Sequence, residues 1–442
     1  MGLPISKVNL VLRTASASRT GFGTPLFQTM SMGTINRVTS YTGTVGVGES
    51  YSTAHPAYLA AKGYMSSPVT VDKFKIGRVL ASLVLTPQSV AEGVVYAFSI
   101  TDGTNTGLCT YTAANGDDAE DIVDNLLADI ATFTDIAANV TETKVGTTTT
   151  ATISLVATGD FAITGITNLA EEYTATETYE ASLAAIRAED DDFWFLSSDT
   201  RTAATQDILA SAIQATSKSY FTASSDADSI AANYTVADTD IASVLKTNNY
   251  SRAACMWDED VTAFPECRYV GVNAAFSPDE RSVVWDGREL VGMSVAINAL
   301  GNELTSSQQA ALDSRNCSYV ATTSVGPRIL GGKMGSGEWI DNIRTQDTII
   351  ARVGEALDTL ILNQAGGKLV GGPVGIALVD AAMVKALNPF LASDALESFT
   401  TDMTAATIDP ATRELSNAQF EVVLKGAIVR VSVNGTAVNQ EV

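Results

Sequence analysis

The sequence of 442 residues predicts an α/β protein, with a helix-covered sheet as its core domain, an inserted α+β protrusion domain and extended β arms at both ends. Three observations support this fold class. Continuous apolar segments alternate with helical segments through the second half of the chain, which is typical of a sheet covered by helices. A Thr- and Ala-rich stretch precedes this region, and both ends show the period of two that marks strands. We therefore divide the chain into residues 1–30 (N-terminal arm), 31–86 (first part of the core), 87–178 (inserted domain), 179–418 (main core) and 419–442 (C-terminal arm).

The two arms are the first elements to justify. In residues 5–13 and 420–434, apolar and polar residues alternate, and the apolar phase of the second segment flips after Gly426. A glycine at such a flip indicates a bulge or bend. Chain ends fray unless something holds them, and a strand added to a neighbour's sheet would do so. We therefore expect intersubunit contacts at Val8, Leu10 and Leu12 of the N-terminal arm and at Phe420, Val422, Leu424, Val429, Val431 and Val433 of the C-terminal arm.

The inserted domain has a β-β-α-β-β pattern. Two strands flank the turn sequence of residues 102–105, which is typical of a hairpin. The helix follows, because Ile122, Leu126, Ile130 and Phe133 recur at spacings of three and four residues. Since the strand predicted at 79–85 precedes this unit and an α/β rhythm follows it, we expect a protrusion from the core. The expected strands are 94–100, 107–112, 149–157 and 160–166.

The core elements are predicted by apolar runs and helical spacing. A short helix is expected at 54–64. The expected strands of the main core are 193–197, 219–223, 251–257 and 317–323. The expected helices are 203–216, 240–248, 264–276, 306–315, 339–362 and a last one from 371 to about 387.

Composition excludes several classes of partner. The formal net charge of −23 disfavours nonspecific binding of nucleic acid and docking on anionic lipid. No run of 18 apolar residues exists, so we expect no membrane anchoring, and the short N-terminal apolar run does not have the form of a signal peptide. The four cysteines form no Cys-x-x-Cys motif, and a chain of this length needs no disulfide, so we interpret them as free or buried thiols in a reducing compartment.

No catalytic or cofactor motif is found. The chain has a single histidine, His55, which lies in a Gly-, Ser-, Thr- and Tyr-rich stretch that we interpret as a surface loop. Gly-x-Ser-x-Gly, a P-loop and Gly-x-Gly-x-x-Gly are absent, and clusters of histidine and cysteine that could bind zinc are impossible. We expect no cofactor, no metal site and no catalytic residue.

Three groups of carboxylates could still carry chemistry. We interpret residues 189–192 as a solvated charge run, Asp199 with Arg201 as a structural ion pair, and Glu338 with Asp341 as helix-start or interface residues. A hydrolase that uses only carboxylates remains an alternative.

An ordered set of segments resembles a known family. Residues 193–202, 218–228, 251–257, 263–272, 335–347 and 426–436 follow one another as they do in the contractile tail sheath proteins of long-tailed, myovirus-type bacteriophages. The likeness covers about residues 33–442 and fits a shorter sheath family with one inserted domain. Its most specific parts are Gly-Glu-Trp-Ile-Asp at 337–341 and Gly-Ala-Ile at 426–428.

The resemblance implies a structural virion protein. Such subunits stack as hexameric rings around a tail tube and contract to drive the tube through the host envelope, while both arms add strands to the sheets of neighbours. Implied partners are other sheath subunits, the tail tube protein, and baseplate and tail terminator proteins. Implied locations are the phage tail and, during assembly, the host cytoplasm. Another phage component, a head or baseplate protein, is the first alternative.

Overall fold

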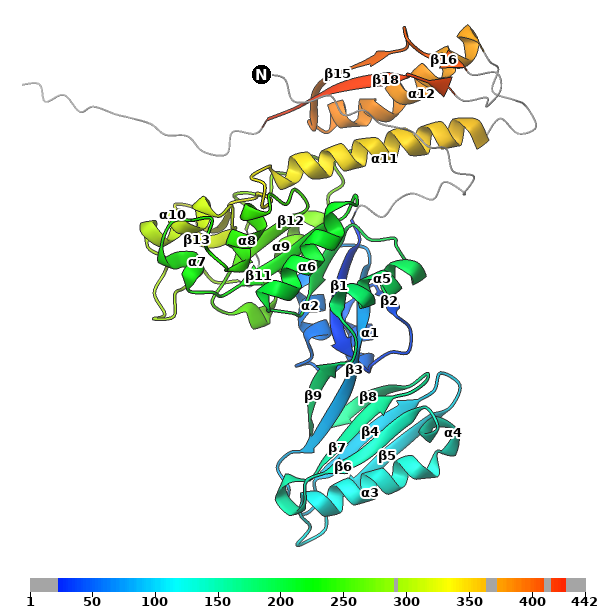
Figure 1. Cartoon of the computed structure of the whole chain (residues 1–442), viewed down its shortest axis with the longest axis vertical. Helices are drawn as coiled ribbons and strands as arrows, with labels where there is room; N and C mark the ends of the chain where they lie inside the picture. The colour runs from blue at the N-terminus through cyan, green and yellow to red at the C-terminus, as the bar shows by residue number, and fades with distance from the viewer. Residues whose placement is uncertain (1–22, 290–292, 363–371, 409–414, 427–442) are drawn as a thin grey trace, which may run out of the picture.

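The chain forms three tiers along its long axis (Figure 1). The computed structural model describes residues 23–289, 293–362, 372–408 and 415–426. The inserted domain lies at one end, the α/β core lies in the middle, and a unit of two long helices and a strand pair lies at the other end. The mixed α/β class predicted from the sequence is therefore confirmed.

The core contains a mainly parallel sheet. Its parallel strands run in the order β12 (Ala253–Trp257), β11 (Ser219–Ser224), β10 (Phe195–Ser198), β1 (Pro25–Ser31) and β3 (Phe74–Pro87), and β2 (Val38–Tyr41) pairs antiparallel with β3. Most of their residues are buried because helices cover both faces. The predicted boundary of the N-terminal arm at residue 30 differs from this structure, since β1 lies in the middle of the sheet.

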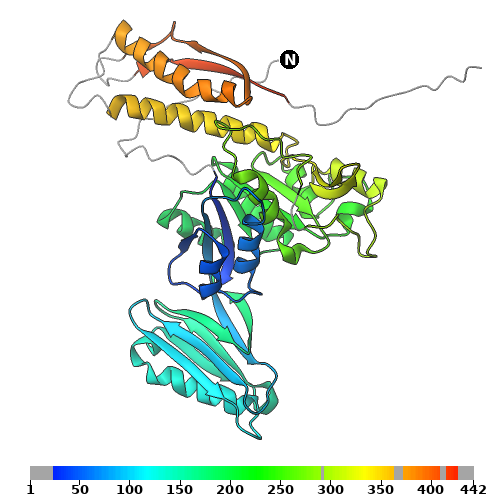
Figure 2. The same ribbon diagram turned by 180° about the vertical axis from the view of Figure 1, so that it is seen from behind.

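Two hydrophobic clusters hold the helices on the sheet, one on each face. On one face lie α2 (Pro56–Tyr64), α9 (Pro265–Ala274) and the short α1 (Thr44–Ser50), packed on Phe27, Phe195 and Phe221. This face is turned toward the viewer in Figure 2, which shows the molecule from behind. The opposite face carries α5 (Tyr179–Glu189), α6 (Ala203–Gln214) and α8 (Ile241–Thr247). The rim is completed by α7 (Asp228–Ala231), η2 (Val261–Ala263), α10 (Ser306–Ser314), β13 (Tyr319–Thr323) and β14 (Gly326–Leu330).

The inserted domain grows out of the core through β3. This strand pairs with β1 and β2 in its first half and with β7 (Thr152–Ala157) and β9 (Leu169–Ala175) in its second. A second sheet has the order β5 (Thr106–Thr112), β4 (Val95–Thr101), β8 (Ala162–Thr167). Leu83 and Leu85 of β3 belong to the hydrophobic cluster of the insertion, so this domain begins inside β3, before the predicted boundary at residue 87.

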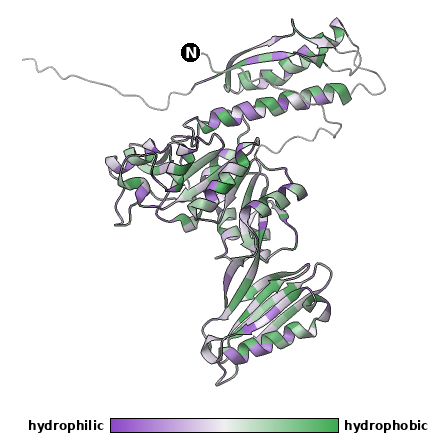
Figure 3. Cartoon of the chain, viewed as in Figure 1, coloured by the Kyte–Doolittle hydropathy of each residue, from purple (hydrophilic) through white to green (hydrophobic). Residues whose placement is uncertain are grey.

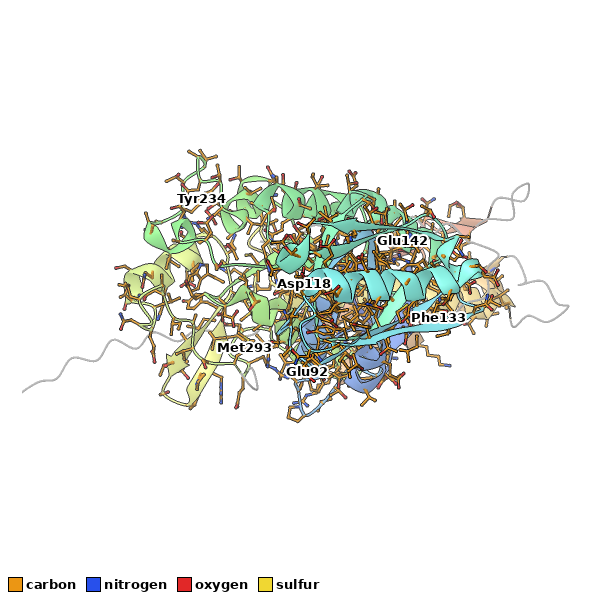
Figure 4. All side chains as sticks on the ribbon, turned by 90° about the horizontal axis from the view of Figure 1, so that it is seen from below. Glu92, Asp118, Phe133, Glu142, Tyr234 and Met293 are labelled. Carbon is orange, nitrogen blue, oxygen red and sulfur yellow. The ribbon has the colours of Figure 1, made fainter. Side chains whose placement is uncertain are left out.

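One long helix packs on the strands of the insertion. It is α3 (Ala119–Thr132), followed by the short α4 (Thr134–Ala137), β6 (Val140–Val145) and η1 (Thr148–Thr150). Seen from the insertion end, α3 runs between Asp118 and Phe133 (Figure 4). Asp118 caps its first turn, and Ile122, Leu126 and Ile130 are buried as their spacing predicted. Strands β6 and β9 lie outside the strands that the sequence pattern predicts.

The third tier is the C-terminal unit, which has its own hydrophobic cluster. It contains α11 (Ile340–Leu362), α12 (Pro373–Ala392), β15 (Leu396–Asp402), β16 (Thr407–Ile408), β17 (Leu415–Ser416) and β18 (Gln419–Leu424). The first turns of α11 pack on the core through Ile340 and Ile343, whereas its later turns pack in the cluster of the C-terminal unit. Arg352 of α11 forms an ion pair with Asp279 of the core at 2.8 Å. The unit is thus attached to the core through α11 and also through Ser393, which donates to Pro278 O at 2.6 Å and accepts from Ser282 N at 3.2 Å.

Within the described residues, α12 is the one helix that is long and apolar enough to cross a membrane, judged by length and composition alone. Asp380 and Lys385 interrupt its apolar residues, so it contains no continuous run of 18. Hydrophobic colour covers much of this helix (Figure 3). Its buried residues are Gly375, Val379, Met383, Leu387 and Phe390, which form one stripe against α11 and the strand pair.

Candidate assembly interface

The C-terminal strand pair is the part of the structure that contains predicted intersubunit residues. Phe420, Val422 and Leu424 lie in β18, as the alternation predicted, and their side chains are partly buried against the cluster of the C-terminal unit. β18 pairs antiparallel with β15 of the same chain, for example Phe420 with Thr401 and Val422 with Phe399. Within residues 419–424, the strand therefore already has a partner in its own subunit.

Among the residues that the structure describes, the strand pair has two open edges. In the described part of the chain, β15 and β18 form a two-stranded sheet that no third strand extends. An isolated pair of strands is only marginally stable, and an unpaired edge offers backbone N–H and C=O groups to a further strand. Here α12 supports one face, so the pair is held in place while its edges remain open.

The face of the pair that points away from α12 is exposed and mixed in character. Val423 is 45% exposed, and the neighbouring positions that share its orientation are polar or acidic. An ion pair of 2.6 Å between Lys425 and Asp394 closes the end of the unit, and Lys425 N donates to Ala395 O at 3.1 Å. These contacts therefore hold Lys425, near the end of the described residues, against the turn that follows α12.

The remaining predicted arm residues fall outside the described residues. These are Val8, Leu10 and Leu12 of the N-terminal arm and Val429, Val431 and Val433 of the C-terminal arm. The N-terminal segment is also the basic part of an acidic chain, since residues 1–22 contain Lys7, Arg13 and Arg19 and no acidic residue. The strand pair carries Glu397, Asp402 and Glu421. The charges of the two segments are thus opposite.

The other candidate residues serve structural roles. Asp199 does not form an ion pair with Arg201. It accepts hydrogen bonds from Thr29 Oγ1 at 2.7 Å, from Met30 N at 3.0 Å and from the Tyr179 hydroxyl, and burial raises its pKa. Arg201 instead binds the fully buried Glu266 at 2.8 Å. These contacts hold the ends of β1 and β10 to α5 and α9.

The two carboxylates of Glu338 and Asp341 differ in burial. Asp341 lies at the start of α11, and burial raises its pKa to about 6, whereas Glu338 is exposed. The charge run at 189–192 forms ion pairs: Asp190 binds Lys75, Asp191 binds Arg187 and Lys218, and Asp192 binds Lys73. These carboxylates attach α5 to β3 and β11. Among the described residues, no group of three or more His, Cys, Asp or Glu could hold a metal ion.

His55 is not a surface residue, contrary to the sequence interpretation. It is 4% exposed, and its Nδ1 accepts from Ala57 N at 3.1 Å as the N-cap of α2. Its ring packs on Tyr51 and on Tyr173 of the insertion. Burial lowers its pKa to about 4, so the ring is neutral near pH 7.

Similarity to known proteins is found in the fold and not in the sequence. No protein-family model and no curated protein matches the sequence. A chain from the structure of the anti-feeding prophage baseplate in its contracted state is similar over 99% of this chain and 98% of that one, with a TM-score of 0.50 and 12% identity. The two chains share one fold. A sheath tail protein from Listeria innocua covers 92% of this chain and 95% of its own, with a TM-score of 0.47 and 12% identity.

Proposed function

We propose that this chain is a structural subunit of a contractile tail sheath. In this proposal, subunits stack as hexameric rings around a tail tube, and contraction of the array drives the tube through the host envelope. The chain would work without catalysis, in contact with its own copies, the tail tube protein, and baseplate and tail terminator proteins. It would be located in the virion after assembly in the host cytoplasm.

The observation that carries the proposal is the open strand pair of the C-terminal unit. A two-stranded sheet on one helix is incomplete by ordinary standards of sheet stability. The same chain has alternating segments at 5–13 and after Gly426, each able to supply a further strand. The fold shared with a chain of the anti-feeding prophage baseplate in its contracted state, over nearly the full length of both, supports this interpretation.

The arms would connect copies by strand addition. We infer that the N-terminal arm, through Val8, Leu10 and Leu12, and the C-terminal arm, through Val429, Val431 and Val433, extend sheets of neighbouring subunits. Phe420, Val422 and Leu424 would anchor the base of the C-terminal arm on its own unit, since they pack there. The basic N-terminal arm would be attracted by the acidic strand pair, so assembly should weaken as salt screens these charges.

A test of assembly is electron microscopy of the purified chain in negative stain. Long hollow tubes support the sheath proposal. Closed shells would favour a head protein, and single particles that bind baseplate components would favour a baseplate protein. The baseplate alternative has a specific basis in the source of the similar chain.

The arms are tested by truncation and substitution. Deleting residues 1–14, or replacing Val429 and Val431 with Asp, should abolish tubes while the melting temperature of the monomer stays unchanged. Lys62→Glu, an exposed change on α2, serves as a charge control that should still form tubes. Tubes formed by the deletion variant would exclude the N-terminal arm as the connecting strand. A large drop in melting temperature for the valine variant would show that its strand belongs to its own subunit.

A further inference from the structure

Two of the four cysteines lie side by side on neighbouring strands of the core. Met256 of β12 and Ser318 form a parallel bridge, in which Ser318 N donates to Cys255 O at 2.9 Å and Trp257 N donates to Ser318 O at 2.8 Å. Cys255 and Cys317 each precede a bridged residue. They therefore occupy adjacent positions in the register of the two strands.

The two thiols point into the same cluster. Both side chains belong to the hydrophobic cluster under α6 and α8, so they lie on one face of the sheet. The Cys317 thiol is 3.5 Å from Cys255 O. Adjacent strands are about 4.8 Å apart, within the range of about 4.4–6.8 Å between Cα atoms that a disulfide can bridge.

We propose that Cys255 and Cys317 form an oxidisable dithiol, which a small-molecule disulfide such as oxidised glutathione converts to an intramolecular disulfide. One thiolate attacks the reagent and releases one thiol, and the second cysteine then displaces the other. Overall, the two cysteines lose two electrons and two protons, and the reagent is reduced to two thiols. The inference is independent of the proposed function.

The surroundings make the reaction selective and slow. Cys255 is 4% exposed and Cys317 1%, so reaction must wait for local opening. The neighbouring Cys317 thiol, together with burial, also raises the pKa of the Cys255 thiol and lowers its thiolate fraction. Cys109 lies in the cluster of the insertion and Cys267 on the other face of the sheet, so neither shares the cluster of the pair. Once formed, the bond would join positions 62 residues apart and should stabilise the fold.

The experiment incubates the folded chain with oxidised glutathione and maps cysteines by peptide mass spectrometry without reduction. We expect one Cys255–Cys317 linkage, reduced Cys109 and Cys267, and a rise of a few degrees in melting temperature that dithiothreitol reverses. Cys317→Ser should abolish both the linkage and the rise, whereas the matched control Cys109→Ser should retain both.

Three results would overturn the proposal. They are four reduced thiols after prolonged incubation of folded protein, glutathione adducts on Cys255 or Cys317 in place of the linkage, and a linkage that forms only after global unfolding. Hydrogen exchange of the same sample distinguishes local opening from global unfolding.

Discussion

At the scale of single residues, burial decides the roles of polar side chains that the sequence leaves ambiguous. His55 has neighbours typical of a loop, yet Tyr51 and Tyr173 enclose its ring. Tyr173 comes from the insertion, 118 positions along the chain, and no local pattern could indicate this contact. Asp199 and Arg201 lie close in sequence but bind different partners, because the strand end directs them to different elements.

The buried histidine gives a pH-dependent stability. Its pKa is about 4 in the folded chain, against about 6.5 when unfolded, so the unfolded state binds more protons between these values. This contribution, at most about 3 kcal/mol, is complete above pH 6.5 and is lost as the pH falls to 4. His55→Asn keeps a capping acceptor and does not titrate. The difference in unfolding free energy between the two proteins should therefore change with pH only in this window.

The unfolding free energy must be compared with that of the asparagine variant, because other groups titrate in the same pH range as His55. Burial raises the pKa of Asp258 and Asp341 to about 6, and these carboxyls change stability in the opposite direction. Both are present in the two proteins, so their contribution cancels in the difference. A difference that is constant from pH 7 to pH 4 would show that the ring of His55 is accessible to protons in the folded chain.

The buried ion pair of Arg201 and Glu266 should respond asymmetrically to substitution. The Glu266 side chain is 1% exposed, whereas Arg201 is 24% exposed and retains contact with water. Arg201→Met leaves a buried carboxylate without its cation and should cost about 3–5 kcal/mol. Glu266→Gln should cost less, about 1–2 kcal/mol. Chemical denaturation checks the order, and adding Glu266→Gln to Arg201→Met should restore part of the loss. Equal costs for both single variants would contradict this account.

At the scale of elements, the spacing of apolar residues predicted those strands and helices whose buried face is wholly apolar. The patterns placed β4, β5, β10, β11 and β12 and most of the long helices correctly, but they predicted no helix at α5, which covers one face of the core sheet. The missed strand β6 has Glu142 and Lys144 on alternate positions, and Lys144 binds Glu120 and Asp124 of α3. In β1, the buried Gln28 donates to Tyr179 O and the buried Thr29 donates to Asp199. Because these residues are polar, the sequence pattern assigned this central strand to the N-terminal arm. Such strands are stabilised by contacts with residues distant in sequence, so their own residues need not be apolar and the sequence pattern does not reveal them.

The candidate interface was predicted only in part for a similar reason. The alternation of β18 was visible, but its partner β15 contains Glu397 and three consecutive polar residues at 400–402 that hide its period. Pairing within the subunit therefore could not be predicted from β18 alone.

Adjacent valines of β18 test which face of the strand pair is structural. Val422 packs against the cluster of the C-terminal unit, whereas Val423 is exposed. Val422→Asp should destabilise this unit by about 2–4 kcal/mol, because apolar burial is lost and a carboxylate is desolvated. Val423→Asp should change stability by less than about 0.5 kcal/mol. Hydrogen exchange of α12 and β15 amides measures both, and faster exchange in the Val423 variant alone would reverse the assignment of faces.

At the scale of the whole molecule, charge and architecture separate the tiers. Residues 87–178 contain 14 acidic side chains and one basic one, Lys144, so more than half of the net charge of −23 resides in the insertion. The sequence predicted an inserted unit but could not place its base. The reason is that β3 is one uninterrupted strand of 14 residues that serves two sheets. An apolar run indicates that a strand is buried. It does not indicate that the first half of the strand pairs with one sheet and the second half with another.

The continuity of β3 determines how the insertion can be removed. Ala81 of β3 and Ala175 of β9 are direct partners in the antiparallel register, so an Asn-Gly turn can join them as a two-residue hairpin. We expect this shortened chain to keep a cooperatively folded core, at reduced stability because Met32 loses its neighbours in the cluster of the insertion. His55 would lose Tyr173, and its pKa should rise toward about 6.5.

Excision of residues 87–178 provides the matched comparison. It leaves Leu83 and Leu85 without their cluster, and this variant should aggregate. Calorimetry and NMR titration of the single histidine measure the two outcomes, and loss of cooperative unfolding in the Ala81–Ala175 variant would show that the insertion and the core form one folding unit.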